Sequence, residues 1–199
     1  MARTRNQDNY DAARDSLLDT GEQLFRQQSF ADTGISDILK KAGVAKGSFY
    51  HYFDSKEDFG IAVVQRYSAS QNAFARDILD NPNKPGLQRL RKFFTTAKSD
   101  MADRGYAEGC LMCNLTTELA DEYPAFQAEL KQNWDQLSAE IQRCLDPEVM
   151  KQIGLSHLKP REAADWLLNA WSGALTRMKA TGDAGPLNLF IKSVFDRKE

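Results

Sequence analysis

Two cysteines placed three residues apart are the side chains in this sequence best suited to covalent chemistry. Cys110 follows Gly109 at the start of a helix predicted over residues 109–121, and Cys113 lies on roughly the same helical face. Unpaired N–H groups and the positive end of the helix dipole favour the nucleophilic thiolate there. The alternative is that free cysteine packs as a small buried hydrophobe. Cys110 and then Cys113 are the candidate reactive thiols, whereas Cys144, in a polar helix, is expected to be structural.

A second stretch, from Ile38 to Lys56, stands out by its charge. It holds four lysines and one acidic residue, a net charge of +3, which leaves −5 for the rest of a chain whose net charge is −2. A short basic segment in an otherwise acidic protein is typical of a compact module that contacts phosphate groups. A solvated helix face produces such a count as well, so the charge indicates nucleic-acid binding only together with a suitable fold.

The elements that must position these residues are helices. Glycine, proline and capping residues divide the chain into helical segments, and no alternating strand pattern is present, which predicts an all-α fold. Ser55 is expected to cap the fourth helix. The predicted helices cover residues 10–28, 35–42, 45–52, 56–79, 87–104, 109–121, 124–145, 160–181 and 186–199, with residues 146–159 as a connection.

Residues 35–53 have the pattern of a helix-turn-helix, in which Gly43 supplies the permissive backbone of the turn. Val44 and Phe49 are expected to pack the two helices together. The second helix would enter the major groove of DNA by its N-terminal end, where lysine binds phosphate or guanine and hydroxyl groups reach backbone oxygens. The alternative is that this is only a compact way to pack three helices. The residues that remain available at the front and sides of the second helix to contact DNA are Lys46, Gly47, Ser48, Tyr50 and His51.

The run from Asp37 to Glu57, DILKKAGVAKGSFYHYFDSKE, closely resembles the DNA-binding signature of the TetR/AcrR family of bacterial repressors. It departs from the common pattern at Gly34 and Ala45, where hydroxyl side chains are frequent. The resemblance implies a DNA-binding domain over residues 1–55 that recognises a palindromic double-stranded operator, and a larger helical sensing and dimerisation domain over residues 56–199. It places on the recognition helix or its phosphate contacts Lys46, Gly47, Ser48, Tyr50, His51, Tyr52 and Lys56.

Gly109-Cys110-Leu111, and the later run Trp171-Ser172-Gly173-Ala174 followed by Lys179, resemble the NemR-like branch of that family. The resemblance implies a repressor released when a cysteine is modified by electrophiles or oxidants, with Lys179 near the reactive thiol. Lys179 could equally be a solvated cation near a helix C-terminus. A closer alternative within the family is induction by reversible binding of a small hydrophobic or unsaturated carboxylate ligand.

Small and apolar residues on the last two helices predict a homodimer. Trp166, Ala170, Gly173 and Ala174 recur at helical spacing, and small residues permit two helices to cross closely. On the last helix the matching residues are Leu187, Phe190, Ile191 and Val194. A two-fold pair would present two recognition helices one DNA turn apart, about 34 Å. A separate set of aromatic and methionine residues could line an effector cavity or form an ordinary core: Phe93, Phe94, Tyr106, Met112, Trp134, Trp166, Trp171 and Met178.

The composition and the absence of certain motifs argue against a membrane protein, a secreted protein and an enzyme. No apolar run approaches the roughly 20 residues that cross a bilayer, and the polar stretch from Met1 to Tyr10 lacks a secretory signal pattern. An odd number of cysteines without framework spacing fits a reducing compartment, so we expect a cytoplasmic protein. There are only two histidines and no Gly-rich phosphate loop or metal-ligand cluster, so no metal, cofactor or enzymatic activity is expected. A thiol-dependent enzyme, which would consume an electrophile catalytically, is the remote alternative.

Overall fold

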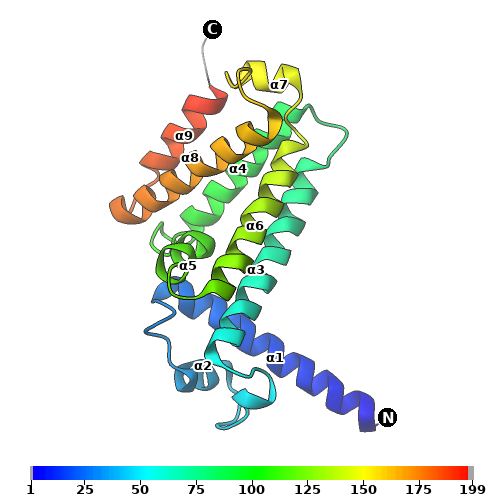
Figure 1. Cartoon of the computed structure of the whole chain (residues 1–199), viewed down its shortest axis with the longest axis vertical. Coiled ribbons are helices and arrows are strands. Elements are labelled where there is room, and N and C mark those ends of the chain that lie inside the picture. The colour runs from blue at the N-terminus through cyan, green and yellow to red at the C-terminus, as the bar shows by residue number, and fades with distance from the viewer. Residues whose placement is uncertain (1, 197–199) are drawn as a thin grey trace. The chain divides into compact units, whose positions relative to one another are not determined.

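Between residues 2 and 196 all regular structure is helical, which confirms the predicted all-α class (Figure 1). The computed structural model describes residues 2–196, with side chains from residue 7 onward, so the side chains of the polar stretch up to residue 6 lie outside the described part. No helix in this part is both long and apolar enough to cross a membrane. The helices are α1 (Ala2–Gln27), α2 (Ile35–Ala42), the 3-10 turn η1 (Phe49–His51), α3 (Lys56–Leu79), α4 (Gly86–Asp103), α5 (Leu111–Leu119), α6 (Pro124–Gln142), α7 (Pro147–Gln152), α8 (Pro160–Thr181) and α9 (Gly185–Phe195).

The chain forms two compact units, one made of residues 2–68 with 114–130, and the other of residues 69–113 with 131–196. Three helices, α3, α5 and α6, contribute residues to both units. The residue-55 boundary expected between DNA-binding and sensing domains remains a prediction.

The first unit is built on an aromatic core. Phe59 of α3 lies at its centre, with ring centroids 5.9 Å from Phe25, 5.4 Å from Phe49 and 4.9 Å from Phe53. A Cβ at Gly21 of α1 would lie 2.4 Å from the Phe59 ring, so glycine permits the close approach of α1 to α3 there. The N-terminus of α3 is capped as the sequence predicts, because the Ser55 hydroxyl accepts the Asp58 backbone N–H at 3.0 Å.

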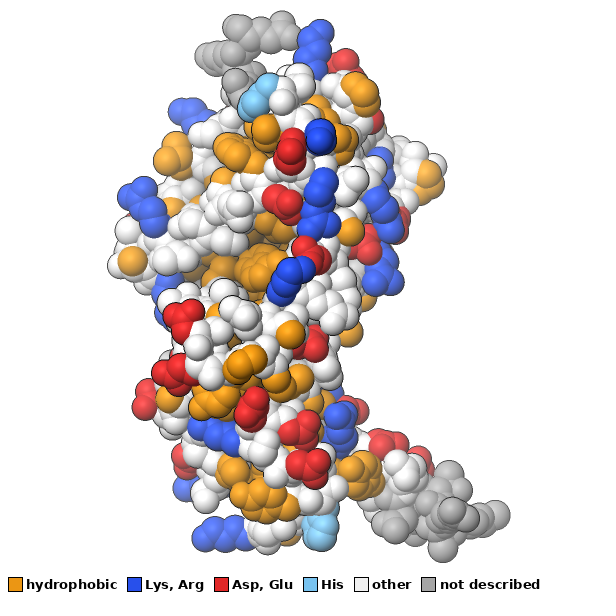
Figure 2. All heavy atoms as spheres, viewed as in Figure 1, with side chains coloured by type: hydrophobic (Ala, Val, Ile, Leu, Met, Phe, Trp, Pro, Cys, Tyr) orange, Lys and Arg blue, Asp and Glu red, His pale blue; other side chains and the backbone are white. Residues whose placement is uncertain are grey.

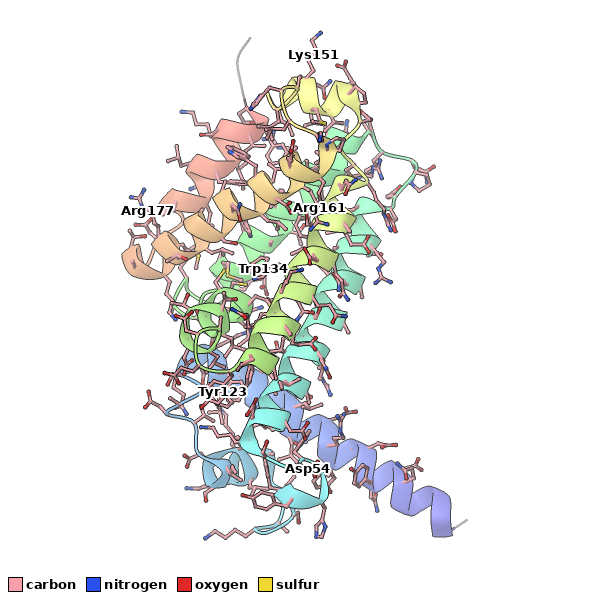
Figure 3. All side chains as sticks on the ribbon, viewed as in Figure 1. Asp54, Tyr123, Trp134, Lys151, Arg161 and Arg177 are labelled. Atoms are coloured by element: carbon pink, nitrogen blue, oxygen red, sulfur yellow. The ribbon has the colours of Figure 1, made fainter. Side chains whose placement is uncertain are left out.

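The second unit packs α9 against both α8 and α4. Its aromatic centre joins these three helices: the Phe94 ring lies 5.2 Å from Trp171 and 4.8 Å from Phe190. In its first half α8 is bound to α6: Arg161, labelled in Figure 3, binds Asp135 of α6 at 2.7 Å, and the buried Ser138 hydroxyl of α6 donates to Asp165 of α8 at 2.5 Å. These polar contacts fix the rotation of α8 relative to α6.

Several predicted boundaries differ from the structure, and two of the larger differences are at the start of α1 and in residues 146–159. α1 begins at Ala2 rather than near residue 10, because no proline or glycine interrupts residues 2–10 and the Gln7 amide donates to Asp11 one turn later at 3.0 Å. The stretch 146–159, expected to be a connection, contains α7. Asp146 caps α7 by accepting the Val149 N–H at 2.8 Å, and Pro147 occupies its first turn. That capping pattern was present in the sequence.

Candidate functional site

The helix-turn-helix segment begins as predicted and then departs from a regular helix. Gly43 ends α2 in the left-handed conformation, with φ +68°, and its N–H bonds back to α2 carbonyls. The short α-helix expected over residues 45–52 is wrong: Ser48 N–H closes a turn on the Ala45 carbonyl at 3.1 Å, and only the single 3-10 turn η1 follows. Gly47 has φ +92°, which a right-handed helix cannot contain.

Most of the predicted DNA-reading side chains nevertheless lie at the surface. Lys46, Gly47, Tyr50 and His51 are exposed, with 66% of Tyr50 accessible, and Ser48 is half-buried. The half-buried ring of Tyr52 stacks on Tyr10 of α1 at 4.7 Å, and the Tyr10 hydroxyl donates to the His51 carbonyl at 3.3 Å. Phe49 faces inward and is 1% exposed. Figure 2 shows acidic and basic side chains intermingled over the face in view.

Lys56 is bound within its own unit. Its ammonium donates to the Ala31 carbonyl at 3.2 Å and lies 4.5 Å from the centre of the Phe30 ring. Burial lowers the pKa of Lys56, although the negative charges of Glu118 and Asp32 act in the opposite direction. The structure therefore directs this side chain to the loop between α1 and α2, and the phosphate contact implied by the family resemblance remains a prediction.

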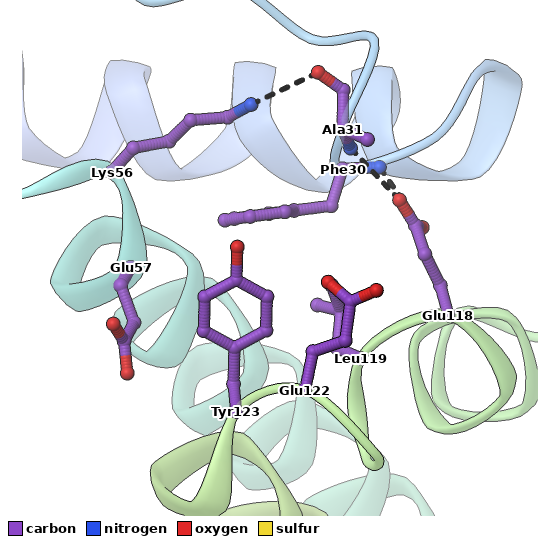
Figure 4. A pocket seen from close by; sticks show the side chains of 8 residues that line it. All are labelled: Phe30, Ala31, Lys56, Glu57, Glu118, Leu119, Glu122 and Tyr123. Carbon is purple, nitrogen blue, oxygen red and sulfur yellow. Dashed lines mark hydrogen bonds between the residues drawn. The ribbon is translucent and has the colours of Figure 1, made fainter.

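Glu118, at the end of α5, is a residue that sequence reasoning missed. Its carboxylate accepts two consecutive backbone N–H groups, from Phe30 at 3.0 Å and from Ala31 at 2.8 Å (Figure 4). Glu118 and the two residues that it binds line part of a pocket of about 370 Å³. No local pattern connects a glutamate with a loop 88 residues earlier in the chain. The pocket is lined by Phe30, Ala31, Lys56, Glu57, Glu118, Leu119, Glu122 and Tyr123.

The two candidate thiols meet at the start of α5. Cys110 directly precedes the helix and Cys113 lies in its first turn; both are half-buried, and neither forms a disulfide. The Cys113 side chain interacts with that of Cys110 and with the Ser172 side chain of α8. The hydrogen bond to Cys110, burial and the negative charge of a Cys110 thiolate raise the pKa of Cys113 far above its usual range.

The other two residues weighed with the thiols lie apart from this contact. Cys144 is buried, and its Sγ donates to the Leu79 carbonyl at 3.5 Å; burial raises the pKa of this thiol. These contacts support the structural role expected for Cys144. Lys179 is exposed on α8, two helical turns beyond Ser172, or about 10 Å along the helix axis. Its sensing role remains a prediction.

Alkylation should discriminate between the three thiols. With less than one equivalent of iodoacetamide at pH 8, we expect Cys110 to be modified before Cys113 and Cys144, because the last two have raised pKa values and only the thiolate reacts. Peptide mapping by mass spectrometry measures the order. In guanidinium chloride the preference should vanish, since it depends on the fold. Modification of Cys113 ahead of Cys110 in the native protein would contradict this assignment.

The residues predicted for the dimer interface fall into two groups. Ala174, Leu187, Phe190, Ile191 and Val194 are buried within their own unit. The surface of α8 instead exposes Trp166 (45% accessible) and Gly173, with Ala170 half-buried, and α9 exposes Leu189 (59%). The exposure of Leu189 was not predicted from the sequence. An apolar residue next to a buried apolar stripe can face either the core or the solvent, and the sequence pattern does not distinguish the two. Arg177, labelled in Figure 3, is exposed on the same helix as Gly173.

Most of the aromatic and methionine residues considered for an effector cavity belong to the core of the second unit. Phe93, Phe94, Met112, Trp171 and Met178 are all buried, which agrees with the core alternative rather than with the lining of an open cavity. Tyr106 and Trp134 are partly buried against that core.

Comparison with known proteins gives a consistent assignment. Residues 17–63 match the family described as bacterial regulatory proteins, tetR family, and residues 86–194 match the tetracyclin repressor-like C-terminal domain. The solved structure of regulatory protein TetR from Rhodobacter sphaeroides superposes with a TM-score of 0.84 at 28% identity, covering 92% of this chain and 96% of that one.

Two curated relatives extend over nearly the whole chain. The transcriptional regulator AcuR of Cereibacter sphaeroides is 33% identical, covering 91% of this chain and 83% of AcuR. The transcriptional repressor NemR of Escherichia coli is 30% identical, covering 87% of each chain, and its reduced form superposes with a TM-score of 0.79 at 28% identity over 92% of this chain and 96% of that one. Both are named regulators of transcription rather than enzymes. The chain belongs to the TetR family of bacterial transcriptional regulators.

Proposed function

We propose that the protein is a homodimeric repressor that leaves its operator when Cys110 reacts with an electrophile or an oxidant. The observation that carries this proposal is that two half-buried thiols, Cys110 and Cys113, lie at the start of α5. Such a position combines access with a local environment that favours the thiolate. The name of the relative NemR, a repressor solved in its reduced form, is in keeping with a redox-responsive regulator.

The helix that begins at the thiols also carries Glu118, whose contact with the loop between α1 and α2 we call the Glu118 clamp. Glu118 lies five residues after Cys113 in α5, and it binds the backbone N–H groups of Phe30 and Ala31. A bulky adduct on Cys110 would disturb the packing at the start of this short helix, whose other end carries Glu118. Release then requires only that the modified protein favour a conformation whose recognition segments do not fit the operator.

DNA recognition would use the exposed surface formed by Lys46, Tyr50 and His51. Two copies of this surface, related by the two-fold axis of a dimer, would read a palindromic operator through successive major grooves.

Fluorescence anisotropy on a duplex from the upstream region of the gene, at fixed salt, tests the proposal. We expect one equivalent of N-ethylmaleimide to weaken binding of the wild type by about tenfold or more, which is 1.4 kcal/mol. Cys110→Ser should stay bound under the same treatment, and Cys144→Ser should respond like the wild type. Lys46→Ala should bind more weakly before any modification and show a salt dependence that is shallower by about one phosphate contact.

The proposal is overturned if the wild type stays bound after mass spectrometry has shown modification of Cys110. A reversible small hydrophobic or carboxylate inducer would then be the effector to screen for, using Cys110→Ser to show that induction needs no covalent bond.

A further inference from the structure

We propose that Tyr10 of α1 is a positioning residue for DNA recognition, which holds His51 and Tyr52 of the recognition segment, residues 45–53, in the conformation that binds the operator. The inference rests on the proposed DNA-reading surface and is independent of the thiols. The N-terminal part of α1 thereby takes part in recognition by fixing the groups that contact the DNA.

The recognition segment has little regular structure of its own. Its first residues form one turn, closed by the Ser48 N–H on the Ala45 carbonyl at 3.1 Å, and the 3-10 turn η1 follows. A regular helix fixes the direction of every side chain through a continuous ladder of backbone bonds, whereas two short turns do so only locally. The direction of the side chains in this segment therefore depends on contacts from the rest of the first unit.

Two phenylalanines anchor the segment from the inside. Phe49 and Phe53 are buried, and both rings pack on Phe59 of α3. Between these anchors lie His51, which is exposed, and Tyr52, which is half-buried. The core fixes the position of the segment, and contacts from α1 orient the two residues between the anchors.

Tyr10 supplies these contacts. Its ring centroid lies 4.7 Å from that of Tyr52, with 33° between the ring planes, and its hydroxyl donates to the His51 carbonyl at 3.3 Å. The Asp54 N–H, which would bond this carbonyl if the 3-10 turn continued, donates instead to the Asp58 carboxylate at 3.1 Å. Tyr10 therefore binds the carbonyl at which the turn ends, one turn before Asp54, which Figure 3 labels.

Two further contacts from α1 support the same segment. Arg14 lies one turn after Tyr10, and its guanidinium lies 5.3 Å from the centre of the Phe53 ring. The Ser16 hydroxyl donates to the Ala42 carbonyl at the end of α2 at 3.1 Å. Thus α1 contacts the chain before the recognition segment and at its end, and Tyr10 is its contact at the DNA-reading residues.

A positioning contact changes affinity through the population of the conformation that can bind. The apparent dissociation constant is the intrinsic one divided by the fraction of molecules in which the segment is correctly oriented. We expect loss of both the ring contact and the hydrogen bond to lower this fraction about tenfold. Specific binding then weakens by the same factor, whereas non-specific binding depends on the charges near phosphate and is unchanged.

The test compares the full-length wild type with Tyr10→Ala, Tyr10→Phe and the control Asn9→Ala, which alters an exposed neighbour in α1. Fluorescence anisotropy measures binding to the upstream duplex and to a duplex of scrambled sequence at the same salt. Hydrogen–deuterium exchange without DNA measures the protection of the recognition segment, and circular dichroism measures the melting temperature.

We expect Tyr10→Ala to bind the upstream duplex about tenfold more weakly, to bind the scrambled duplex within about twofold of the wild type, and to exchange faster in the recognition segment alone. Its melting temperature should stay near the wild-type value, because the Tyr10 side chain is partly exposed. Tyr10→Phe keeps the ring contact and loses only the hydrogen bond, so its loss on the upstream duplex should be about threefold or less. Asn9→Ala should match the wild type in every measurement.

Equal losses of Tyr10→Ala on the two duplexes, or faster exchange throughout the first unit with a lower melting temperature, would show a purely structural role and overturn the inference. Unchanged exchange in the recognition segment, or unchanged affinity for the upstream duplex, would overturn it as well. The proposed function fails separately. A Lys46→Ala protein that binds the upstream duplex like the wild type, or a wild type that stays bound after Cys110 is modified, would refute the proposed function while the Tyr10→Ala result stands.

Discussion

Replacing Gly173 with arginine is expected to separate the protein into monomers and to weaken its binding to a palindromic operator by about 100-fold, because two linked binding events become one. A Cβ added at Gly173 meets no atom within 4 Å, so the monomer itself has room for a side chain. A second copy packed on this face would then be what limits the size of the side chain at position 173.

The surroundings of Gly173 support this expectation. Ala170 and Trp166 lie one and two turns earlier on α8, and Trp166 of α8 and Leu189 of α9 are large apolar side chains left exposed. Exposed aromatic and aliphatic residues next to a small residue are typical of a helix-pairing surface between protein copies. A charged arginine at each copy's Gly173 would force the helices apart and repel its symmetry mate.

Sedimentation velocity at several protein concentrations measures the change in mass, and anisotropy measures the change in DNA affinity. Ala102→Arg places the same side chain at an exposed helical position on α4 and should leave the dimer intact. Gly173→Ala should keep the dimer if the crossing tolerates a methyl group, with helix propensity adding up to about 1 kcal/mol of stability. A Gly173→Arg protein that sediments as the wild type does would rule out this face as the interface.

The second large effect is expected at Glu118. Glu118→Gln keeps the shape of the side chain but removes its charge and turns an amide NH₂ group toward one of the two backbone N–H donors of Phe30 and Ala31. Loss of a charge-assisted hydrogen bond at this partly exposed site costs about 1.5 kcal/mol, or roughly 3–6 °C in melting temperature for a chain of this size. Binding to DNA would then have to order the loop between α1 and α2 again, and this cost is expected to lower the affinity for DNA about tenfold.

Thermal unfolding followed by circular dichroism and anisotropy on the operator measure the two effects. Glu122→Gln is the matched control, because Glu122 lines the same pocket and is exposed. It removes the same charge without touching the clamp, so its melting temperature and DNA affinity should stay near the wild-type values. Equal behaviour of the two variants would show that the charge of the pocket, rather than the clamp, determines these properties.

Local features of this protein could be predicted from its sequence. The bounds of α2 and α8 agree with the expected 35–42 and 160–181, and the Ser55 cap and the Gly43 turn occur where they were expected. Each depends on residues within one or two turns of one another, where capping, proline and glycine act directly on the backbone. The family signature over residues 37–57 is similarly local, and it sufficed to identify the family.

Tertiary structure alone decided which apolar residues are core and which are surface. Periodicity marks Leu187, Phe190 and Ile191 as one stripe, but the stripe faces α4 and α8, and Leu189 is left exposed beside it. The Glu118 clamp and the contact between Ser172 and Cys113 join residues distant in sequence. A sequence pattern reports that a face is apolar or that a side chain can bond; which neighbour meets it depends on how the helices pack.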